Sequence, residues 1–295
     1  MKFDVVLTNP PFQDRHSRGR TPHKLWIEFT TATFDRLLRP GGLLLQITPT
    51  SFQSPSSKVL RLMCTLDTQL INFDIAQHFP GVGSSFAYYA IRHRPHAAAT
   101  TVTIDGATFQ FDLDDSVRWL PSDLSESSLS IHRKTMWSGR PLLPVEHDYI
   151  THHNIRLGDT LSKTPTPTHV YPVFHTNAQT WYGSVRQPFA DRVKIMWTRS
   201  GYTKPFLDLG QLGGSDMVYY IVVKSRAAGR NLLHNLTLPL MRYIFATARW
   251  SGFGNEIVFH SLPALPTDRA LSAAELYDVF GLTDQERHYV EQYLG

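Results

Sequence analysis

A double proline directly after a short apolar run is the feature that most constrains the fold of this chain. Residues 3–7 are mainly apolar, and Asn9-Pro10-Pro11-Phe12 follows one residue later. Proline lacks a backbone N–H and fixes its φ angle, so two in a row end a strand. The pattern predicts a buried strand that leads into a rigid loop at residue 9.

Strand-like and helical segments alternate through the first ninety residues. A helix over residues 25–38 ends at Arg39-Pro40-Gly41-Gly42, and a second helix over residues 58–66 follows an N-cap at Ser54-Pro55-Ser56-Ser57. The other expected strands cover residues 43–48, 70–75 and 86–92. This alternation predicts an α/β fold with a mostly parallel, doubly wound sheet, whose ligands bind at the carboxyl ends of the strands.

The composition changes near residues 94–99, which are polar and alanine-rich. We therefore expect three parts: a catalytic α/β part over 1–95, a β-rich α+β domain over 96–270, and a helical segment over 271–295. Within the second part, Pro239 is expected to kink or split a helix over residues 227–248. Strand-like runs there cover residues 101–104, 108–113, 192–197 and 217–223. Two C-terminal helices are predicted by capping-box spacing at Ser272-Ala273-Ala274-Glu275 and Thr283-Asp284-Gln285-Glu286.

The double-proline loop has a specific chemical use. The Pro10 carbonyl and the Asn9 side-chain carbonyl can only accept hydrogen bonds, and Phe12 adds a flat apolar face. Such a site suits the exocyclic amine of adenine, because accepting both of its protons localises the nitrogen lone pair for attack on an electrophilic methyl group. A base in a duplex reaches such a loop only when it is flipped out. The alternative is a plain turn at the end of a strand.

The segment from Phe3 to Gln13 resembles the catalytic motif of amino-methyltransferases that use S-adenosylmethionine, in its adenine-specific DNA form, and residues 38–49 resemble the next stretch of that domain. The resemblance implies a partial Rossmann-like methyltransferase sheet, a catalytic role for Asn9, Pro10, Pro11 and Phe12, and Phe79 as a second aromatic against the flipped base. Residues 250–255 and 262–266 are similar to the target-recognition region of restriction-modification methylases, the TaqI-like enzymes among them. Double-stranded DNA is the implied substrate.

In that family a cofactor-binding half, with a glycine-rich loop and an acidic strand end, precedes the motif. Here the motif begins at residue 9. A circular permutation would need residues 207–215 as the cofactor loop, yet the strand-like run 217–223 follows where a helix is required. A cofactor-binding half on a second chain and a truncated reading frame both stay open. Either way, we expect the chain alone to bind S-adenosylmethionine weakly or not at all.

Basic residues suggest contacts with nucleic acid. The formal net charge is +4, and the segment after the motif carries four cations expected to meet DNA phosphates: Arg15, Arg18, Arg20 and Lys24. A second set between residues 181 and 204 interleaves aromatic and basic side chains that could read bases. This set includes Trp181, Tyr182, Lys194, Trp197, Arg199 and Lys204. A solvated loop and ordinary core packing are the alternatives.

The cysteine and histidine residues limit the disulfides, the cellular location and the metal sites that the sequence allows. The single cysteine, Cys64, permits no disulfide within the chain, and no apolar stretch is long enough for a signal peptide or a membrane span, so a cytoplasmic protein is expected. His147, His152 and His153 lie close in sequence, but no Cys or carboxylate completes a ligand set at the usual spacing. No metal site is predicted.

Three other functions compete with methylation of adenine in DNA. A protein glutamine methyltransferase could use the same corner, but the long basic and aromatic region after it favours a nucleic acid. An RNA adenine methyltransferase would meet the same amine in a looped base. The third is a non-catalytic DNA-binding subunit of a restriction-modification system.

Overall fold

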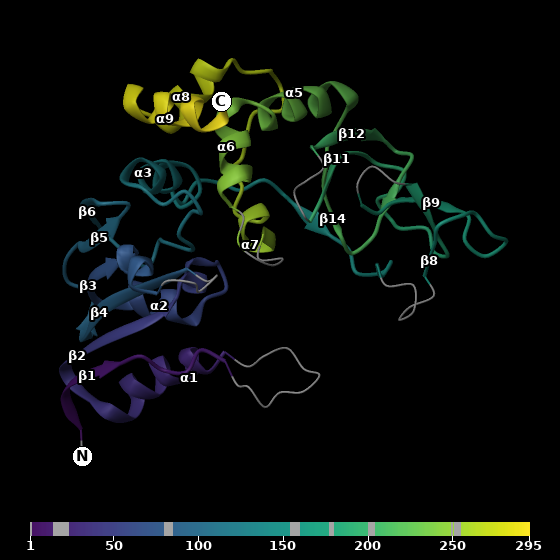
Figure 1. The fold of residues 1–295 in the computed structure, drawn as a ribbon. Coiled ribbons are helices and arrows are strands. Elements are labelled where there is room, and N and C mark those ends of the chain that lie inside the picture. Colours follow the sequence, from purple (N-terminus) through teal and green to yellow (C-terminus); the bar gives the residue numbers. More distant parts are fainter. Residues whose placement is uncertain are drawn as a thin grey trace. The chain divides into compact units, whose positions relative to one another are not determined.

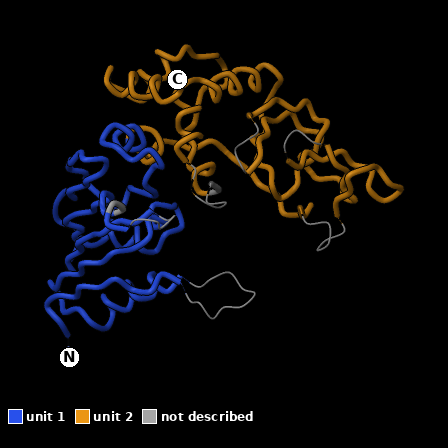
Figure 2. Tube along the Cα trace, in the orientation of Figure 1, with its two compact units in different colours: residues 1–133 blue, residues 134–295 orange. Residues whose placement is uncertain are grey.

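The computed structural model describes residues 2–13, 24–79, 85–153, 160–176, 180–199, 204–248, 250 and 255–295. The chain divides into two compact units, Met1–Arg133 and Lys134–Gly295 (Figure 2). Within the described ranges, no helix combines the length and the apolar character needed to cross a bilayer.

The first unit is built on a six-stranded sheet in the order β1-β2-β4-β3-β5-β6 (Figure 1). β1 is parallel to β2, and β3 is parallel to β5. β4 is antiparallel to both β2 and β3, and β6 is antiparallel to β5. The strands are β1 (Phe3–Thr8), β2 (Leu38–Pro49), β3 (Leu66–Asn72), β4 (Phe86–Pro95), β5 (Thr100–Ile104) and β6 (Ala107–Phe111).

The mostly parallel, doubly wound arrangement expected from the sequence is therefore wrong for neighbouring strands. β1, β2, β3 and β5 do share one direction, but β4 runs between β2 and β3 in the opposite direction. Only the 3-10 turn Asp74–His78 is assigned between β3 and β4 in the described part of that connection, and no crossover helix is found there. Parallel neighbours are usually joined by a crossover helix, and an antiparallel neighbour needs none.

Two helices follow the first two strands along the chain. α1 (Leu25–Ala32) continues as a π-helical turn, Thr33–Leu37, and α2 (Lys58–Thr65) begins at Ser57, whose side chain accepts a hydrogen bond from the Leu60 N–H. α2 passes directly into β3, so that strand starts at Leu66 rather than at residue 70 as expected. The first two helices and all four early strands were correctly expected from the sequence, apart from their ends.

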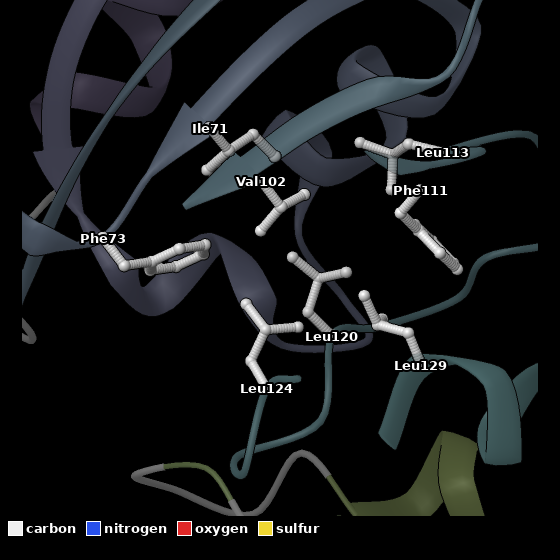
Figure 3. Close-up of a pocket in the computed structure, with 8 residues that line it drawn as sticks. All are labelled: Ile71, Phe73, Val102, Phe111, Leu113, Leu120, Leu124 and Leu129. Atoms are coloured by element: carbon white, nitrogen blue, oxygen red, sulfur yellow. The ribbon is translucent and has the colours of Figure 1, made fainter. Parts of the chain in front are cut away.

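The first unit extends well beyond residue 95. Figure 3 shows a small apolar cavity of about 10 Å³ whose lining mixes Ile71 and Phe73, from the expected first part, with side chains from the expected second part. The latter are Val102, Phe111, Leu113, Leu120, Leu124 and Leu129. Pairing of β5 with β3 and this shared core place the compact boundary after Arg133. A connector rich in alanine resembles a linker in composition but here leads into another strand of the same sheet.

The second unit holds two four-stranded sheets, in the orders β13-β9-β10-β8 and β12-β11-β14-β7. The first consists of β8 (Leu161–Ser162), β9 (Tyr171–Phe174), β10 (Thr180–Gly183) and β13 (Gly213–Gly214). The second consists of β7 (Glu146–His147), β11 (Val193–Thr198), β12 (Phe206–Leu209) and β14 (Val218–Val222). A buried cluster joins side chains from both sheets, including Phe174, Met196 and Val218. The expected β-rich character is confirmed.

Helices form the rest of the chain. Pro239 splits the expected long helix into α5 (Arg226–Leu236) and α6 (Pro239–Thr247). Both predicted capping boxes are present, at Ser272 before α8 (Ala273–Phe280) and at Thr283 before α9 (Asp284–Leu294). The remaining helices are α3 (Glu126–Thr135), which spans the boundary between the units, and α7 (Asn255–Phe259).

Candidate functional site

The double-proline corner lies where β1 ends, at one edge of the first sheet. Thr8, the last residue of β1, is in register with Gln46 of β2. Asn9 and Pro11 are exposed, Pro10 is buried and Phe12 is half-buried. The buried proline anchors the corner to the fold, while the Asn9 side chain is open to solvent.

An aromatic side chain that the sequence did not single out lies between the two expected stacking residues. The Phe86 ring centroid lies 5.2 Å from that of Phe12 and 5.1 Å from that of Phe79, in tilted geometry. Phe86 begins β4, is in register with Pro49 at the end of β2, and is 3% exposed. The antiparallel insertion of β4 thus brings Phe12 and Phe79 to a shared buried ring, and this pairing could not be read from the spacing of the three residues.

Buried polar side chains fix the sheet behind the corner. The Gln46 side-chain amide donates to Thr30 Oγ1 at 2.9 Å, and the Thr30 hydroxyl donates to the Trp26 carbonyl at 2.8 Å. Tyr89 Oη lies 3.5 Å from the same Thr30 oxygen. Burial raises the pKa of Tyr89 to about 12, so its hydroxyl keeps its proton. These contacts tie α1 to β2 and β4, and give the corner a rigid support.

β1 was expected to be buried, and this expectation is wrong. It pairs only with β2 among the described residues, and its alternate residues Phe3, Val5 and Leu7 are 44%, 54% and 80% exposed. Alternate residues of a strand share one face. An apolar run identifies a strand, but the sequence does not say whether anything covers that strand. In the described part of the chain, the edge strand that carries the corner is therefore paired on one side only and has an exposed apolar face.

An open pocket of about 380 Å³ lies beside the start of α1 and combines two lysines, Lys24 and Lys58, with four serines. Its lining residues are Lys24, Trp26, Ile27, Glu28, Ser51, Ser54, Ser56, Ser57 and Lys58. Of the four cations expected to meet phosphates after the motif, only Lys24 is described; Arg15, Arg18 and Arg20 lie outside the described residues. Lys58 was not predicted, because it belongs to α2, far from the motif in sequence.

The second expected basic and aromatic set does not form one surface. Arg199 is half-buried and Lys204 is exposed, whereas Lys194 and Trp197 are fully buried in β11. The Lys194 ammonium donates to Asp208 at 2.6 Å, with their side chains 0% and 2% exposed. Lys194 and Trp197 therefore serve packing, and the expectation that they face nucleic acid is wrong.

The contacts of Asp208 show whether residues 207–215 can hold a cofactor. Its carboxylate accepts hydrogen bonds from Lys194 and from the backbone N–H groups of Gly210 and Gln211. Gly210 has a φ of +89°, and a Cβ there would lie 2.6 Å from the Asp191 carbonyl oxygen. The turn is closed by these contacts and continues through β13 into β14 rather than into a helix. These residues do not fit S-adenosylmethionine.

No protein-family model matches the sequence, and a comparison with curated proteins finds no match. Among solved structures, the type IIL restriction-modification enzyme MmeI, solved in complex with DNA, matches 99% of this chain and 55% of its own at 10% identity and a TM-score of 0.41. The type IIG restriction endonuclease BpuSI matches 96% of this chain and 49% of its own, at 10% identity and a TM-score of 0.34.

The M protein of the type I restriction enzyme EcoKI matches 34% of this chain and 25% of its own, at 18% identity and a TM-score of 0.28. The chain thus spans between about a quarter and about half of these three structures. All three are named as restriction or restriction-modification proteins. With TM-scores this low, the function proposed next depends on this chain's own residues.

Proposed function

We propose that the first unit supplies the base-binding corner of an adenine-specific DNA methyltransferase. The observation that carries the proposal is an exposed Asn9 between the end of β1 and a buried proline, with Phe12 beside it. Two acceptor oxygens, on the Asn9 side chain and the Pro10 carbonyl, hold the exocyclic amine of an extruded adenine. When the amine donates both of its N–H groups in these hydrogen bonds, the nitrogen lone pair is localised, and no strong base is needed.

The aromatic side chains bind the extruded base. Phe12 stacks on the adenine and Phe79 offers the second face, while the buried Phe86 ring contacts both phenylalanine rings. A base–aromatic stack contributes about 1–3 kcal/mol, comparable with the few kcal/mol that unpairing costs. The corner can therefore hold the base without reading its neighbours.

Phosphates beside the extruded nucleotide bind in the serine-lined pocket. Lys24 and Lys58 provide charge there, and the serine hydroxyls can donate to phosphate oxygens. Arg15, Arg18 and Arg20, which lie outside the described residues, are assigned to neighbouring phosphates. Target recognition is assigned to the second unit, with Arg199 and Lys204 on its DNA-facing side.

S-adenosylmethionine supplies the electrophilic methyl group, and a separate cofactor-binding half holds it. The 207–215 turn is closed by Asp208 and does not fit the cofactor. The unpaired edge and apolar face of β1 support the proposal, because a cofactor-binding half can pair a strand with β1 and pack against Phe3, Val5 and Leu7.

The test mixes the full chain with soluble extract from its source cells, DNA and radiolabelled S-adenosylmethionine, and measures label at N6 of adenine after digestion. Asn9→Ala is expected to lower the rate by about 100–1,000-fold, as for other groups that bind a reacting centre. Asn9→Asp keeps an acceptor oxygen and is expected to retain more activity than Asn9→Ala. Equal label with wild type and Asn9→Ala would exclude the catalytic role.

The same assay separates the competing functions. An RNA methyltransferase would label RNA in the extract and leave duplex DNA unlabelled. A non-catalytic DNA-binding subunit would support labelling of DNA by the extract regardless of Asn9, although it would still bind DNA. Replacing Lys24 and Lys58 by glutamine is expected to lower the slope of log affinity against log salt by about one for each lost phosphate contact.

A further inference from the structure

A group of two histidines and one aspartate meets in the second unit. His153 Nδ1 lies 2.8 Å from Asp216 Oδ2, and His152 Nε2 lies 3.7 Å from the same oxygen. One ligand atom from each residue lies within 4.8 Å of the other two. The histidines follow β7 and the aspartate lies between β13 and β14, so the fold creates the group.

Asp216 is held firmly by contacts that leave Oδ2 directed at the two imidazoles. Its Oδ1 accepts the His153 backbone N–H at 2.8 Å, and its own N–H donates to the Thr151 carbonyl at 2.9 Å. The His152 and His153 rings are stacked, with centroids 4.5 Å apart and planes at 23°. Backbone hydrogen bonds of this kind orient a ligating side chain before the metal arrives.

We propose that His152 Nε2, His153 Nδ1 and Asp216 Oδ2 bind one divalent transition-metal ion, with zinc as the first candidate. Imidazole nitrogen and carboxylate oxygen are ligands that zinc accepts, at about 2.0–2.2 Å. In a tetrahedral site such ligand atoms lie about 3.3 Å apart. The two distances to Asp216 Oδ2, 2.8 Å from His153 and 3.7 Å from His152, lie on either side of that value.

Burial favours a cation at this place. Asp216 is 7% exposed, and a buried carboxylate is costly unless a positive charge or several hydrogen bonds offset it. The side chains of His152 and His153 are 38% and 46% exposed, which leaves one side open for water as a fourth ligand. The sequence predicted no metal because Asp216 lies 63 positions from His153.

The ion would act as a clamp within the second unit. Asp216 lies in the link that joins β13 of one sheet to β14 of the other, and the histidines lie on the segment after β7. Binding would therefore fix that segment to the junction of the two sheets. A bound metal stabilises the folded state by an amount that grows with its concentration.

The alternative interpretation is a hydrogen-bonded cluster that binds no metal. The two interpretations differ in the part that His152 plays. Its 3.7 Å distance from Asp216 Oδ2 is too long for a hydrogen bond but suits a shared ion. A purely hydrogen-bonded cluster depends on His153 and Asp216. A metal site depends equally on His152.

The experiment uses the full chain without an affinity tag, stripped with a chelator, and titrated with Co²⁺ while visible absorption is recorded. One equivalent is expected to produce saturable d–d bands, and Zn²⁺ is expected to displace it and raise the Tm. His152→Gln is expected to weaken binding at least tenfold, as is Asp216→Asn. His288→Gln, an exposed histidine on α9, is the matched control and should bind as wild type does.

Because Asp216 is buried, Asp216→Asn can fail to fold. His152 is partly exposed, so His152→Gln is expected to fold, and circular dichroism checks that it does. Absence of saturable Co²⁺ binding by folded wild-type protein would overturn the proposal. So would undiminished binding by folded His152→Gln protein, since the remaining histidines would then account for the signal.

Discussion

The two edge strands of the six-stranded sheet, β1 and β6, expose different kinds of side chain. β1 exposes Phe3, Val5 and Leu7, whereas the exposed positions of β6 are Ala107, Thr108 and Gln110. The guanidinium of Arg133, on α3, lies 4.8 Å above the Phe111 ring at the end of β6. An apolar edge with unpaired backbone groups invites pairing, while a polar edge covered by a charged side chain resists it. The sheet is thus closed on the β6 side and open on the β1 side.

The position of the corner gives this difference a functional meaning. Asn9 follows the last residue of the open edge, so whatever pairs with β1 comes to lie beside the proposed adenine site. A cofactor-binding half placed there would bring the methyl donor next to the amine. The closed edge, β6, lies at the opposite end of the strand order from β1. We infer that the open edge is an assembly surface.

The largest effect is expected from a charge placed on the open edge. Leu7→Asp should weaken recovery of methylation by the source extract at least about 100-fold, because it loses roughly 1.5–3 kcal/mol of apolar burial and places a carboxylate in the interface. The unfolding free energy of the chain itself should change little, since Leu7 is 80% exposed. The amount of extract that gives half-maximal activity is the measurement.

Thr108→Asp on the closed edge is the matched control, and should need no more extract than wild type does. Equal recovery by the Leu7 and Thr108 variants would contradict the assignment of β1 as the assembly edge. It would leave the chemistry of Asn9 to be tested separately by Asn9→Ala.

The sequence predicted the local elements better than their surroundings. The strand before Asn9, the split at Pro239 and the capping boxes at Ser272 and Thr283 follow from short-range chemistry and are confirmed. The burial of β1 and the direction of β4 depend on which strands become neighbours, and short-range patterns do not carry that information. The positions of Phe86, Lys58 and Asp216 beside their neighbours were missed for the same reason, because the fold alone brings these residues together.

A second effect, on stability, is expected from acid on the closed side of the sheet. His132 on α3 is fully buried and its Nδ1 lies 2.9 Å from the Ser128 carbonyl. Burial lowers the pKa of His132 to about 4 from its ordinary value of 6.5. The unfolded chain therefore gains a proton first as pH falls, so the stabilisation is complete above pH 6.5 and is lost between about 6.5 and 4, by roughly 2–4 kcal/mol.

Urea unfolding of the full chain between pH 7.5 and 4.5 measures this loss. His132→Gln, which stays neutral, should show a shallower decline of the unfolding free energy with falling pH than wild type. The exposed His288→Gln variant serves as the control and should follow wild type. A decline in His132→Gln as steep as in wild type would assign the acid sensitivity to other groups.

The smallest effect comes from comparing one arginine at each edge. Arg133 donates to Asp114 at 2.9 Å, and both side chains are 33% exposed. Although burial alone raises it, the pKa of Asp114 is held below its usual value by hydrogen bonds from Ser116 and Arg133. Arg39 pairs with Asp4 at the open edge, where the side chains are 63% and 71% exposed.

Arg133→Ala should lower the unfolding free energy by about 1–2 kcal/mol, because it removes a partly shielded charged hydrogen bond and the cover over Phe111. Arg39→Ala should change it by less than about 0.5 kcal/mol, since an exposed ion pair exchanges one set of contacts for water. Urea unfolding at pH 7 compares the two variants directly. If Arg39→Ala were the more destabilising variant, contacts within this chain would already stabilise the open edge. That result would contradict the inference that β1 pairs with a partner.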